Sequence, residues 1–222
     1  MHNLSPRKIQ LEACLFDSDL DFNDLIQLLF LCDSKGVSVI SVPSSLLSYK
    51  QRFTINAKPA CLIDFPLGMS SLRSRISSCL DAINNGAEIL DICCNPFYII
   101  NLQKSKLEQD IRSAIALGKE RGIQIRYILN HRNYSPSDYL RYCSLLYDCG
   151  VEYLINHDGM SVDDPTDNLI VADEVMRNIN LNVIPSSMMF ETQHLDLLEN
   201  TKITSLRVCS KKIGRFLAPQ GV

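Results

Sequence analysis

Short apolar segments alternate along the chain with longer segments that have helical periodicity. Eight of the short segments are predominantly apolar and rich in β-branched residues: 9–16, 37–42, 60–65, 88–94, 123–129, 152–155, 181–185 and 203–209. Near-continuous apolar character is typical of strands that are buried on both faces of a parallel sheet. The pattern therefore predicts eight buried parallel strands.

The segments between these strands carry the signals of amphipathic helices. Within 70–86, apolar residues recur at helical spacing from Leu72 to Ile83, and Gly86 provides a stop signal. The same kind of pattern recurs over 106–122, 135–150 and 164–178. Strand and helix thus alternate without a linker rich in proline, glycine or serine, so we expect one domain over residues 1–222.

Alternating strands and helices indicate an α/β fold in which helices cover a parallel sheet. Eight such units favour a single (β/α)8 TIM barrel, and a doubly wound open sheet is the alternative. In both folds, ligands bind at the carboxyl ends of the strands. The candidate site is therefore expected among the residues that end each predicted strand.

Composition and charge exclude several classes of partner. The net charge of −3 offers no basic face for nucleic acid. No apolar run approaches the roughly 20 residues that a membrane-spanning helix needs. The N-terminal segment 1–16 lacks the basic start and long apolar core of a signal peptide. We expect a cytoplasmic protein that binds neither nucleic acid nor membrane.

The chain has nine cysteines, without a CxxC pair or a zinc-type spacing. Most of them stand within apolar segments, where a reduced cysteine behaves as a small core residue. We therefore expect neither a disulfide framework nor a metal site built from cysteine, and no cofactor is predicted.

One block of the sequence is distinctive. Residues 63–95, IDFPLGMSSLRSRISSCLDAINNGAEILDICCN, place Phe-Pro-Leu-Gly at a strand end and lead through Asn-Gly-Ala to a strand that carries Asp91. This block resembles the corresponding segment of deoxyribose-phosphate aldolases. Weaker matches to the family occur at 10–16 and 39–46, before this block, and at 149–160 and 181–189, after it. They appear in the same order as in the family. The resemblance implies an aldolase-like (β/α)8 barrel.

The resemblance also implies a chemistry, which this chain does not retain. Those aldolases form a Schiff base on a strand-six lysine, use a strand-seven lysine to lower its pKa, and relay protons through a strand-four aspartate. The aspartate falls on Asp91, whereas the lysine positions fall on Ile155 and Ile184. No lysine occurs anywhere in 120–201. The chain therefore resembles a divergent aldolase without Schiff-base catalysis.

The phosphate site implied by the resemblance is altered as well. The glycine pair that binds phosphate after strand seven is replaced by Ser187 and Met188. Lys211, Lys212 and Arg215 follow strand eight, near the position where the family holds its phosphate. These three cations equally suit the end of a solvated C-terminal helix.

Polar residues near the predicted strand ends supply the candidate site. Asp91 and His157, with Asp158 as a positioning carboxylate, are the candidates for acid/base catalysis. Alternatively, Asp91, His131 and His157 could ligate a divalent metal that polarises a carbonyl. The candidate ligand-binding residues are Asn95, Asn156, Ser186 and Ser210. Since isoleucines replace both lysines, we expect the pKa of Asp91 to rise in a dry site without cations.

Three functions remain open. The first is a barrel that binds a small sugar-like or aldehyde ligand, with or without a phosphate, or acts on it by lyase-type acid/base chemistry. The second is a non-catalytic interaction or scaffold protein, and the third is a metal-assisted lyase. Assembly into a homo-oligomer is compatible with each. An open pocket around Asp91 would favour a small-molecule function, and a filled barrel mouth would favour an interaction protein.

Overall fold

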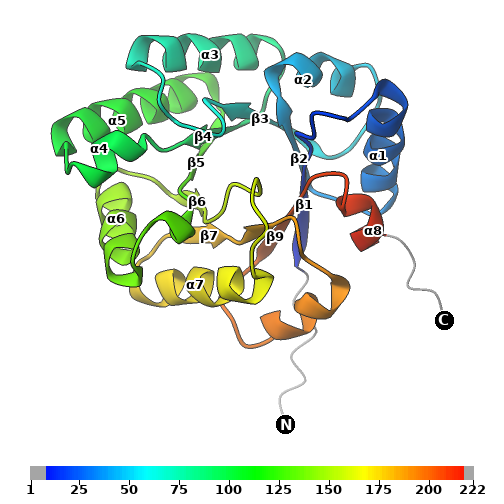
Figure 1. Cartoon of the computed structure of the whole chain (residues 1–222). Helices are drawn as coiled ribbons and strands as arrows, with labels where there is room; N and C mark the ends of the chain where they lie inside the picture. The colour runs from blue at the N-terminus through cyan, green and yellow to red at the C-terminus, as the bar shows by residue number, and fades with distance from the viewer. Residues whose placement is uncertain (1–8, 218–222) are drawn as a thin grey trace.

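The structure is a computed structural model that describes residues 9–217, and it shows a ring of parallel strands surrounded by helices (Figure 1). The strands are β1 (Gln10–Cys14), β2 (Val39–Pro43), β3 (Lys58–Ile63), β4 (Ile89–Cys93), β5 (Gln124–Ile128), β6 (Tyr153–Ile155), β7 (Asn182–Ile184), β8 (Ser186–Ser187) and β9 (Ser205–Cys209). The α-helices are α1 (Phe22–Ser34), α2 (Ser44–Gln51), α3 (Leu72–Asn84), α4 (Pro96–Ile100), α5 (Lys104–Arg121), α6 (Pro136–Asp148), α7 (Pro165–Asn178) and α8 (Ile213–Leu217). Two 3₁₀ helices are η1 (His131–Asn133) and η2 (Thr192–Leu198).

The ring nearly closes through the extended segment that contains β7 and β8. β7 pairs with β6, where Ile155 is opposite Ile184, and β8 pairs with β9, where Ser186 is opposite Arg207. Pro185 separates the two short strands and has no N–H to donate to a ladder. Every strand pair is parallel, and the order runs from β7 through β1 to β9 and β8. The prediction of a (β/α)8 barrel is confirmed over an open sheet.

The helix boundaries follow from local signals in the sequence. α6 begins after Ser135, whose hydroxyl accepts a hydrogen bond from the N–H of Asp138 (3.2 Å), and Pro136 occupies its first turn. α5 ends at Gly122, whose φ of 67° lies in the left-handed region that glycine adopts without strain. None of the helices within 9–217 is long and apolar enough to cross a membrane.

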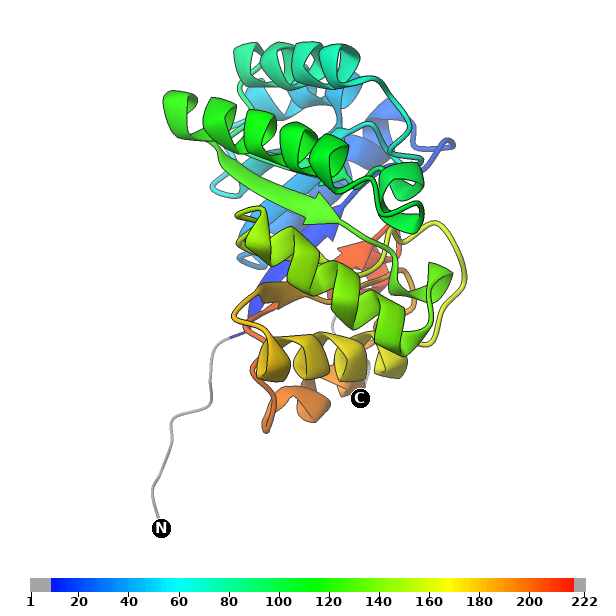
Figure 2. The same cartoon turned by 90° about the vertical axis from the view of Figure 1, so that its left-hand side faces the viewer.

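In the side view, the helices lie on the outside of the strands (Figure 2). The interior of the barrel is layered, because alternate residues of each strand point inward. Outward residues pack against the helices in one large apolar core. The amino-end layer includes Val39, Ala60 and Ile89. The middle layer is polar and charged: Glu12, Ser41, Asp91, Arg126 and Arg207. The carboxyl-end layer is apolar: Cys14, Leu62, Cys93, Ile128, Ile155, Ile184 and Cys209.

Candidate functional site at the carboxyl end of the barrel

Asp91 lies at the centre of a buried ion cluster. Its carboxylate accepts hydrogen bonds from Arg126 Nε (2.6 Å) and Nη2 (3.0 Å), from Arg207 Nη1 (2.9 Å) and from Ser41 Oγ (2.6 Å). Arg126 Nη1 also donates to both oxygens of Glu12, at 2.9 and 2.8 Å. Two arginines and two carboxylates thus balance one another inside the barrel.

The expected rise in the pKa of Asp91 is wrong. Burial alone would raise the pKa of this carboxyl. The charges of Arg126 and Arg207 and the hydrogen bonds have a larger, opposite effect, and they lower the pKa to about 2. The cations are Arg126 on β5 and Arg207 on β9, which the expectation of a site without cations did not include. A carboxylate that stays ionised and fully hydrogen-bonded is a weak general base at neutral pH.

An apolar layer separates Asp91 from the carboxyl end. The next inward residue of β4 is Cys93, which is paired through the sheet register with Ile128 of β5, and Ile128 is paired with Ile155. Ile155 and Ile184, the two positions to which the resemblance assigns the family's lysines, both belong to this layer and are 0% and 5% exposed. Phe16, Phe65 and Met188 pack against it. The barrel mouth above Asp91 is therefore filled by side chains.

His157 lies on the outer side of that layer, in a second buried polar cluster. Its Nδ1 accepts a hydrogen bond from the N–H of Gly159 (2.9 Å) and lies 3.4 Å from a carboxylate oxygen of Asp163. His131 approaches it with ring centroids 6.3 Å apart. Burial lowers the pKa of both imidazoles and outweighs the opposing effects of Asp163 near His157 and of a hydrogen bond to His131. Both rings are therefore neutral at neutral pH.

Asn168 of α7 organises this cluster and was not identified from the sequence. Its side chain contacts His131 Nε2 (2.7 Å), donates to Asp163, and donates to the backbone oxygen of Ser186 (2.9 Å). Asn156 donates to the backbone oxygen of Asn168 (2.7 Å) and accepts from the N–H of Ser186 (3.2 Å). The predicted ligand residues Asn156 and Ser186 are thus brought together, with their polar groups joining β6 and β8 to α7.

Other candidates satisfy the local backbone. Asn95 caps α4 by accepting from the N–H of Tyr98 (3.1 Å). Asp158 accepts from Asn130 Nδ2 (2.9 Å) and from the N–H of Met160 (2.9 Å). Ser210, with a φ of 68°, accepts from the N–H of Lys212 (3.3 Å).

The structure does not gather the candidates around one centre. Asp91 lies one inward position below the apolar layer, and His157 lies one position above it, beyond Ile155. His131 is close to His157 and belongs to the same outer cluster, so it also lies on the far side of the layer from Asp91. In the part of the chain that the structure describes, no three His, Cys, Asp or Glu side chains are arranged to hold a metal ion. This geometry gives no support to a metal shared by Asp91 and the two histidines.

A cavity of about 310 Å³ opens beside β8 and β9, lined by Met188, Met189, Phe190, Glu191, Thr192, Lys212, Arg215 and Phe216. The Lys212 amine donates to the sulfur of Met189 (3.2 Å). Within residues 9–217, neither Lys212 nor Arg215 forms an ion pair, whereas Lys211 pairs with Asp19 and Asp24 at 3.1 Å each. The three cations after β9 therefore have different surroundings, and two of them line a cavity with both polar and apolar walls.

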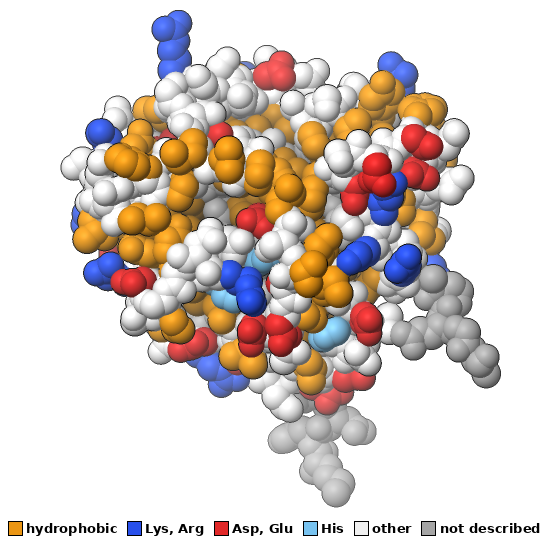
Figure 3. All heavy atoms as spheres, in the orientation of Figure 1, with side chains coloured by type: hydrophobic (Ala, Val, Ile, Leu, Met, Phe, Trp, Pro, Cys, Tyr) orange, Lys and Arg blue, Asp and Glu red, His pale blue; other side chains and the backbone are white. Residues whose placement is uncertain are grey.

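Exposed apolar side chains surround the filled mouth. Figure 3 views the carboxyl end and shows a band of apolar atoms across this face. The following residues lie in segments that follow strand ends, and each is at least 50% exposed: Phe22, Leu67, Met69, Phe97, Ile100, Leu102, Met160 and Val162. A concentration of large exposed apolar side chains of this kind is typical of binding surfaces.

Comparison with known proteins supports the aldolase resemblance. No protein-family model matches the chain. A deoxyribose-phosphate aldolase from Thermococcus kodakarensis is 21% identical over 118 residues, so the match spans 53% of each protein. A tetrameric deoxyribose-phosphate aldolase from Aeropyrum pernix has a TM-score of 0.78 at 14% identity, over 94% of this chain and 88% of that one. The aldolase QR15 has a TM-score of 0.80 at 13% identity, over 95% and 93%. The chain thus resembles deoxyribose-phosphate aldolases in sequence and shares the aldolase barrel fold.

Proposed function

We propose that this chain is an aldolase-fold binding protein without Schiff-base catalysis, which holds a small anionic ligand at the carboxyl end of its barrel. The apolar layer over Asp91 is the observation that supports the absence of Schiff-base catalysis. Ile155 and Ile184 stand in that layer, at the positions where the resemblance would place lysines. Below the layer, the carboxylate of Asp91 is ion-paired with Arg126 and Arg207. A site with neither a nucleophilic amine nor a free proton acceptor supports binding rather than aldol cleavage.

The cavity beside Lys212 and Arg215 is the proposed ligand site. Its two cations exceed the single carboxylate of Glu191, so the cavity favours an anionic group. Phe190, Phe216 and two methionines supply apolar walls for the rest of the ligand. A phosphorylated sugar or aldehyde fits this combination of one anionic group and a small carbon skeleton.

The absence of catalysis is tested with 2-deoxyribose 5-phosphate and borohydride. We expect no retro-aldol product from the pure protein and no mass adduct on any lysine after reduction. A stable adduct, mapped to a lysine by peptide mass spectrometry, would contradict the proposal.

The ligand site is tested separately with inorganic phosphate as the probe, titrated by calorimetry. We expect Lys212→Ala and Arg215→Ala each to weaken phosphate binding by about tenfold, because each removes a charge-assisted hydrogen-bond donor. Lys211→Ala is the matched control, since its amine is already paired with Asp19 and Asp24. Equal weakening by all three changes would show that bulk charge, and not this cavity, binds the anion.

The filled barrel mouth above Asp91, which is the outcome expected of an interaction protein, favours a second candidate function, and so does the exposed apolar face. This function is association with a second copy of this chain. The solved relative from Aeropyrum pernix is a tetramer. Met160 and Val162 are 51% and 77% exposed on this face. We expect glutamate at both positions to shift the mass measured by light scattering toward the monomer. Ile170→Glu, on the 59% exposed position of α7, is the control. A wild-type protein that is monomeric at all concentrations would eliminate this candidate.

A further inference from the structure

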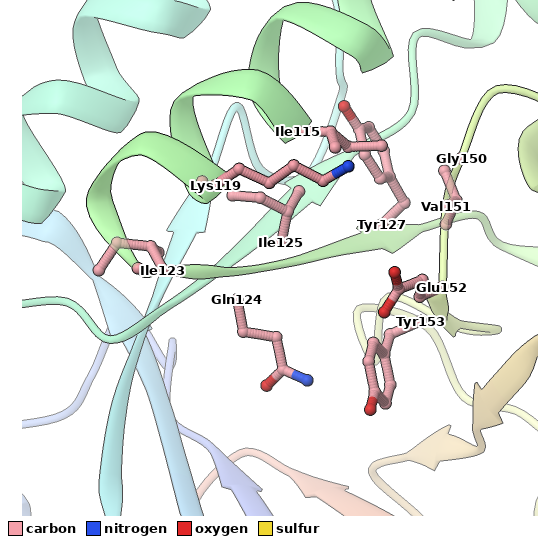
Figure 4. Close-up of a pocket in the computed structure, with 12 residues that line it drawn as sticks. Ile115, Lys119, Ile123, Gln124, Ile125, Tyr127, Gly150, Val151, Glu152 and Tyr153 are labelled. Atoms are coloured by element: carbon pink, nitrogen blue, oxygen red, sulfur yellow. The ribbon is translucent and has the colours of Figure 1, made fainter.

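The amino end of the barrel, opposite the expected site, contains a polar cavity of about 270 Å³. Its lining includes the first inward residues of six strands: Gln10, Lys58, Gln124, Tyr153, Asn182 and Ser205. Figure 4 shows two of them, Gln124 and Tyr153, projecting to the same side of β5 and β6, opposite to Ile125 and Tyr127.

Sheet register brings these side chains into one ring. Gln10 is opposite Ser205, and Tyr153 is opposite Asn182. Gln124 is paired with Ile89. Residues paired in this way lie side by side on neighbouring strands, so their inward side chains approach one another inside the barrel. The polar ring is therefore a consequence of the register and not of flexible loops.

The cavity reaches the charged middle layer. Glu12 and Arg126 form its inner end, where they are ion-paired at 2.8 Å and are 3% and 2% exposed. Val39, Ile89 and Ile184 supply apolar wall. Lys58, Arg126 and Glu12 together leave one positive charge along the lining. The cavity thus combines a dry, charged inner end with a ring of neutral polar groups.

Several polar groups of the ring have no partner within the protein. Among the described residues, the side chains of Gln10, Lys58, Gln124 and Tyr153 make no hydrogen bond or ion pair to another group. Gln124 and Tyr153 are half-buried, and Gln10 and Lys58 are exposed at the rim of the cavity. Asn182 donates to the backbone oxygen of Glu152 (3.2 Å). Side-chain amides both donate and accept hydrogen bonds, so each can pair with a hydroxyl group of a ligand, which also does both. The aromatic ring of Tyr153 provides an apolar surface beside them.

We infer that this cavity binds a small polyhydroxylated molecule that carries one carboxylate, a sugar acid. Its volume lies just below the range of roughly 300–1,000 Å³ typical of ligand pockets, which suits a ligand of monosaccharide size. The amides of Gln10 and Gln124 match hydroxyl groups, and the positive charge of Lys58 matches the carboxylate. This site is independent of the anion cavity at the opposite end of the barrel.

The test is an NMR titration of the side-chain amides of Gln10, Gln124 and Asn182, with D-gluconate and D-glucose as probes. We expect progressive shifts of these resonances with gluconate at a millimolar dissociation constant, and about tenfold weaker binding of glucose. Lys58→Met should abolish the difference between the two probes. Gln124→Leu should weaken both by about tenfold, because it removes one donor and one acceptor.

Lys212→Ala, at the opposite end of the barrel, is the matched control and should leave gluconate binding unchanged. Circular dichroism and thermal unfolding establish that each variant is folded. The inference is overturned if folded wild-type protein shows no shift of the three amides, if the shifts cluster around Lys212 instead, or if Gln124→Leu binds gluconate as tightly as wild type. Equal affinity for the two probes overturns the assignment of a carboxylate to Lys58.

Discussion

Asp91 and Arg126 are register partners on β4 and β5 and are joined by two hydrogen bonds, from Nε to Oδ1 at 2.6 Å and from Nη2 to Oδ2 at 3.0 Å. The aspartate that the family resemblance makes a proton relay is thus one half of a bidentate ion pair. Glu12 and Arg207 complete the cluster, so that two positive and two negative charges share the interior. The cluster makes Asp91 a structural anion that helps to hold the barrel together.

The first prediction concerns the loss of one member of the cluster. Arg126→Met leaves Glu12 and Asp91 buried with fewer partners, and we expect it to lower the free energy of unfolding by about 3–5 kcal/mol. Arg177→Met is the matched control, because the Arg177 side chain is 55% exposed and pairs with Asp173 at the surface. We expect the control to change stability by less than about 1 kcal/mol. Urea denaturation measures both, and similar effects would contradict a dominant role for the cluster.

The second prediction concerns acid stability. The pKa of Asp91 is about 2 in the folded protein against an ordinary value of 3.8, so the folded state binds a proton less readily than the unfolded state. The resulting stabilisation, roughly 2 kcal/mol, is complete above about pH 4 and is lost as the pH falls toward about 2. Asp91→Asn removes this dependence. We therefore expect urea midpoints to fall less steeply between about pH 5 and pH 2 in the variant, and parallel curves would contradict the assigned pKa.

The barrel could be predicted because its determinants are local and repeated. Apolar runs marked the strands, and Gly122 and Ser135 marked helix boundaries by their backbone chemistry. The break at Pro185, which divides the seventh strand into β7 and β8, was not predicted. It depends on how the ring closes, and closure is a relation between distant strands.

The ion cluster could not be predicted from single segments, although its signal is present. Glu12, Arg126 and Arg207 each stand alone in an apolar strand, at the same inward parity as Asp91. Four strands that each carry one central charge, two of each sign, indicate a neutral buried cluster once the barrel is assumed. The loss of lysines from β6 and β7 does not leave Asp91 without cations, because the two arginines pair with it. The predicted rise in the pKa of Asp91 was therefore wrong.

Asn95 and Asp158 illustrate a different limit. Asparagine and aspartate side chains cap helices and turns with the same oxygens that bind ligands. In the structure, both residues accept hydrogen bonds from nearby backbone N–H groups. Sequence alone does not distinguish these uses, because the distinction depends on where the following backbone turns.

The third prediction concerns the loop after β6. Gly159 has a φ of 77°, and a Cβ there would lie 2.4 Å from the sulfur of Cys209. Gly159→Ala combines a left-handed backbone with overpacking, so we expect a loss of about 3 kcal/mol of stability. Gly36→Ala is the matched control, since Gly36 has a φ of 68° but no atom within 4 Å of the added carbon. We expect about 1 kcal/mol there, and equal losses would mean that the loop does not pack on β9 as described.

The fourth prediction compares two cysteines of the same apolar layer. Burial raises the pKa of the Cys14 thiol, but the hydrogen bond from Cys209 and the charge of Arg207, whose Nη2 lies 2.7 Å from the Cys14 sulfur, lower it below the ordinary value. Burial raises the pKa of Cys93. Both thiols are buried, so iodoacetamide reaches them during local opening of the structure. Because the thiolate is the reactive form, we expect Cys14 to be modified faster than Cys93. Peptide mass spectrometry over a time course measures the order, and faster modification of Cys93 would contradict it.

The last prediction restores an amine to the position that the family resemblance assigns to the Schiff-base lysine. Ile155 is 0% exposed and is the register partner of both Ile128 and Ile184, directly above the layer that contains Arg126 and Arg207. In Ile155→Lys, burial penalises the ammonium form, and the ion cluster below adds no net charge, because its two arginines are balanced by two carboxylates. We therefore expect the pKa of this lysine to fall well below about 10.4. A neutral amine attacks aldehydes, and acetaldehyde is small enough to reach it during local opening of the mouth. We expect borohydride to trap an adduct at position 155 near neutral pH, with a loss of a few kcal/mol in stability. Ile170→Lys, at a 59% exposed position, is the control with an ordinary ammonium group and should trap little. A folded Ile155→Lys variant that traps no more than this control would show that position 155 does not correspond to the family's lysine.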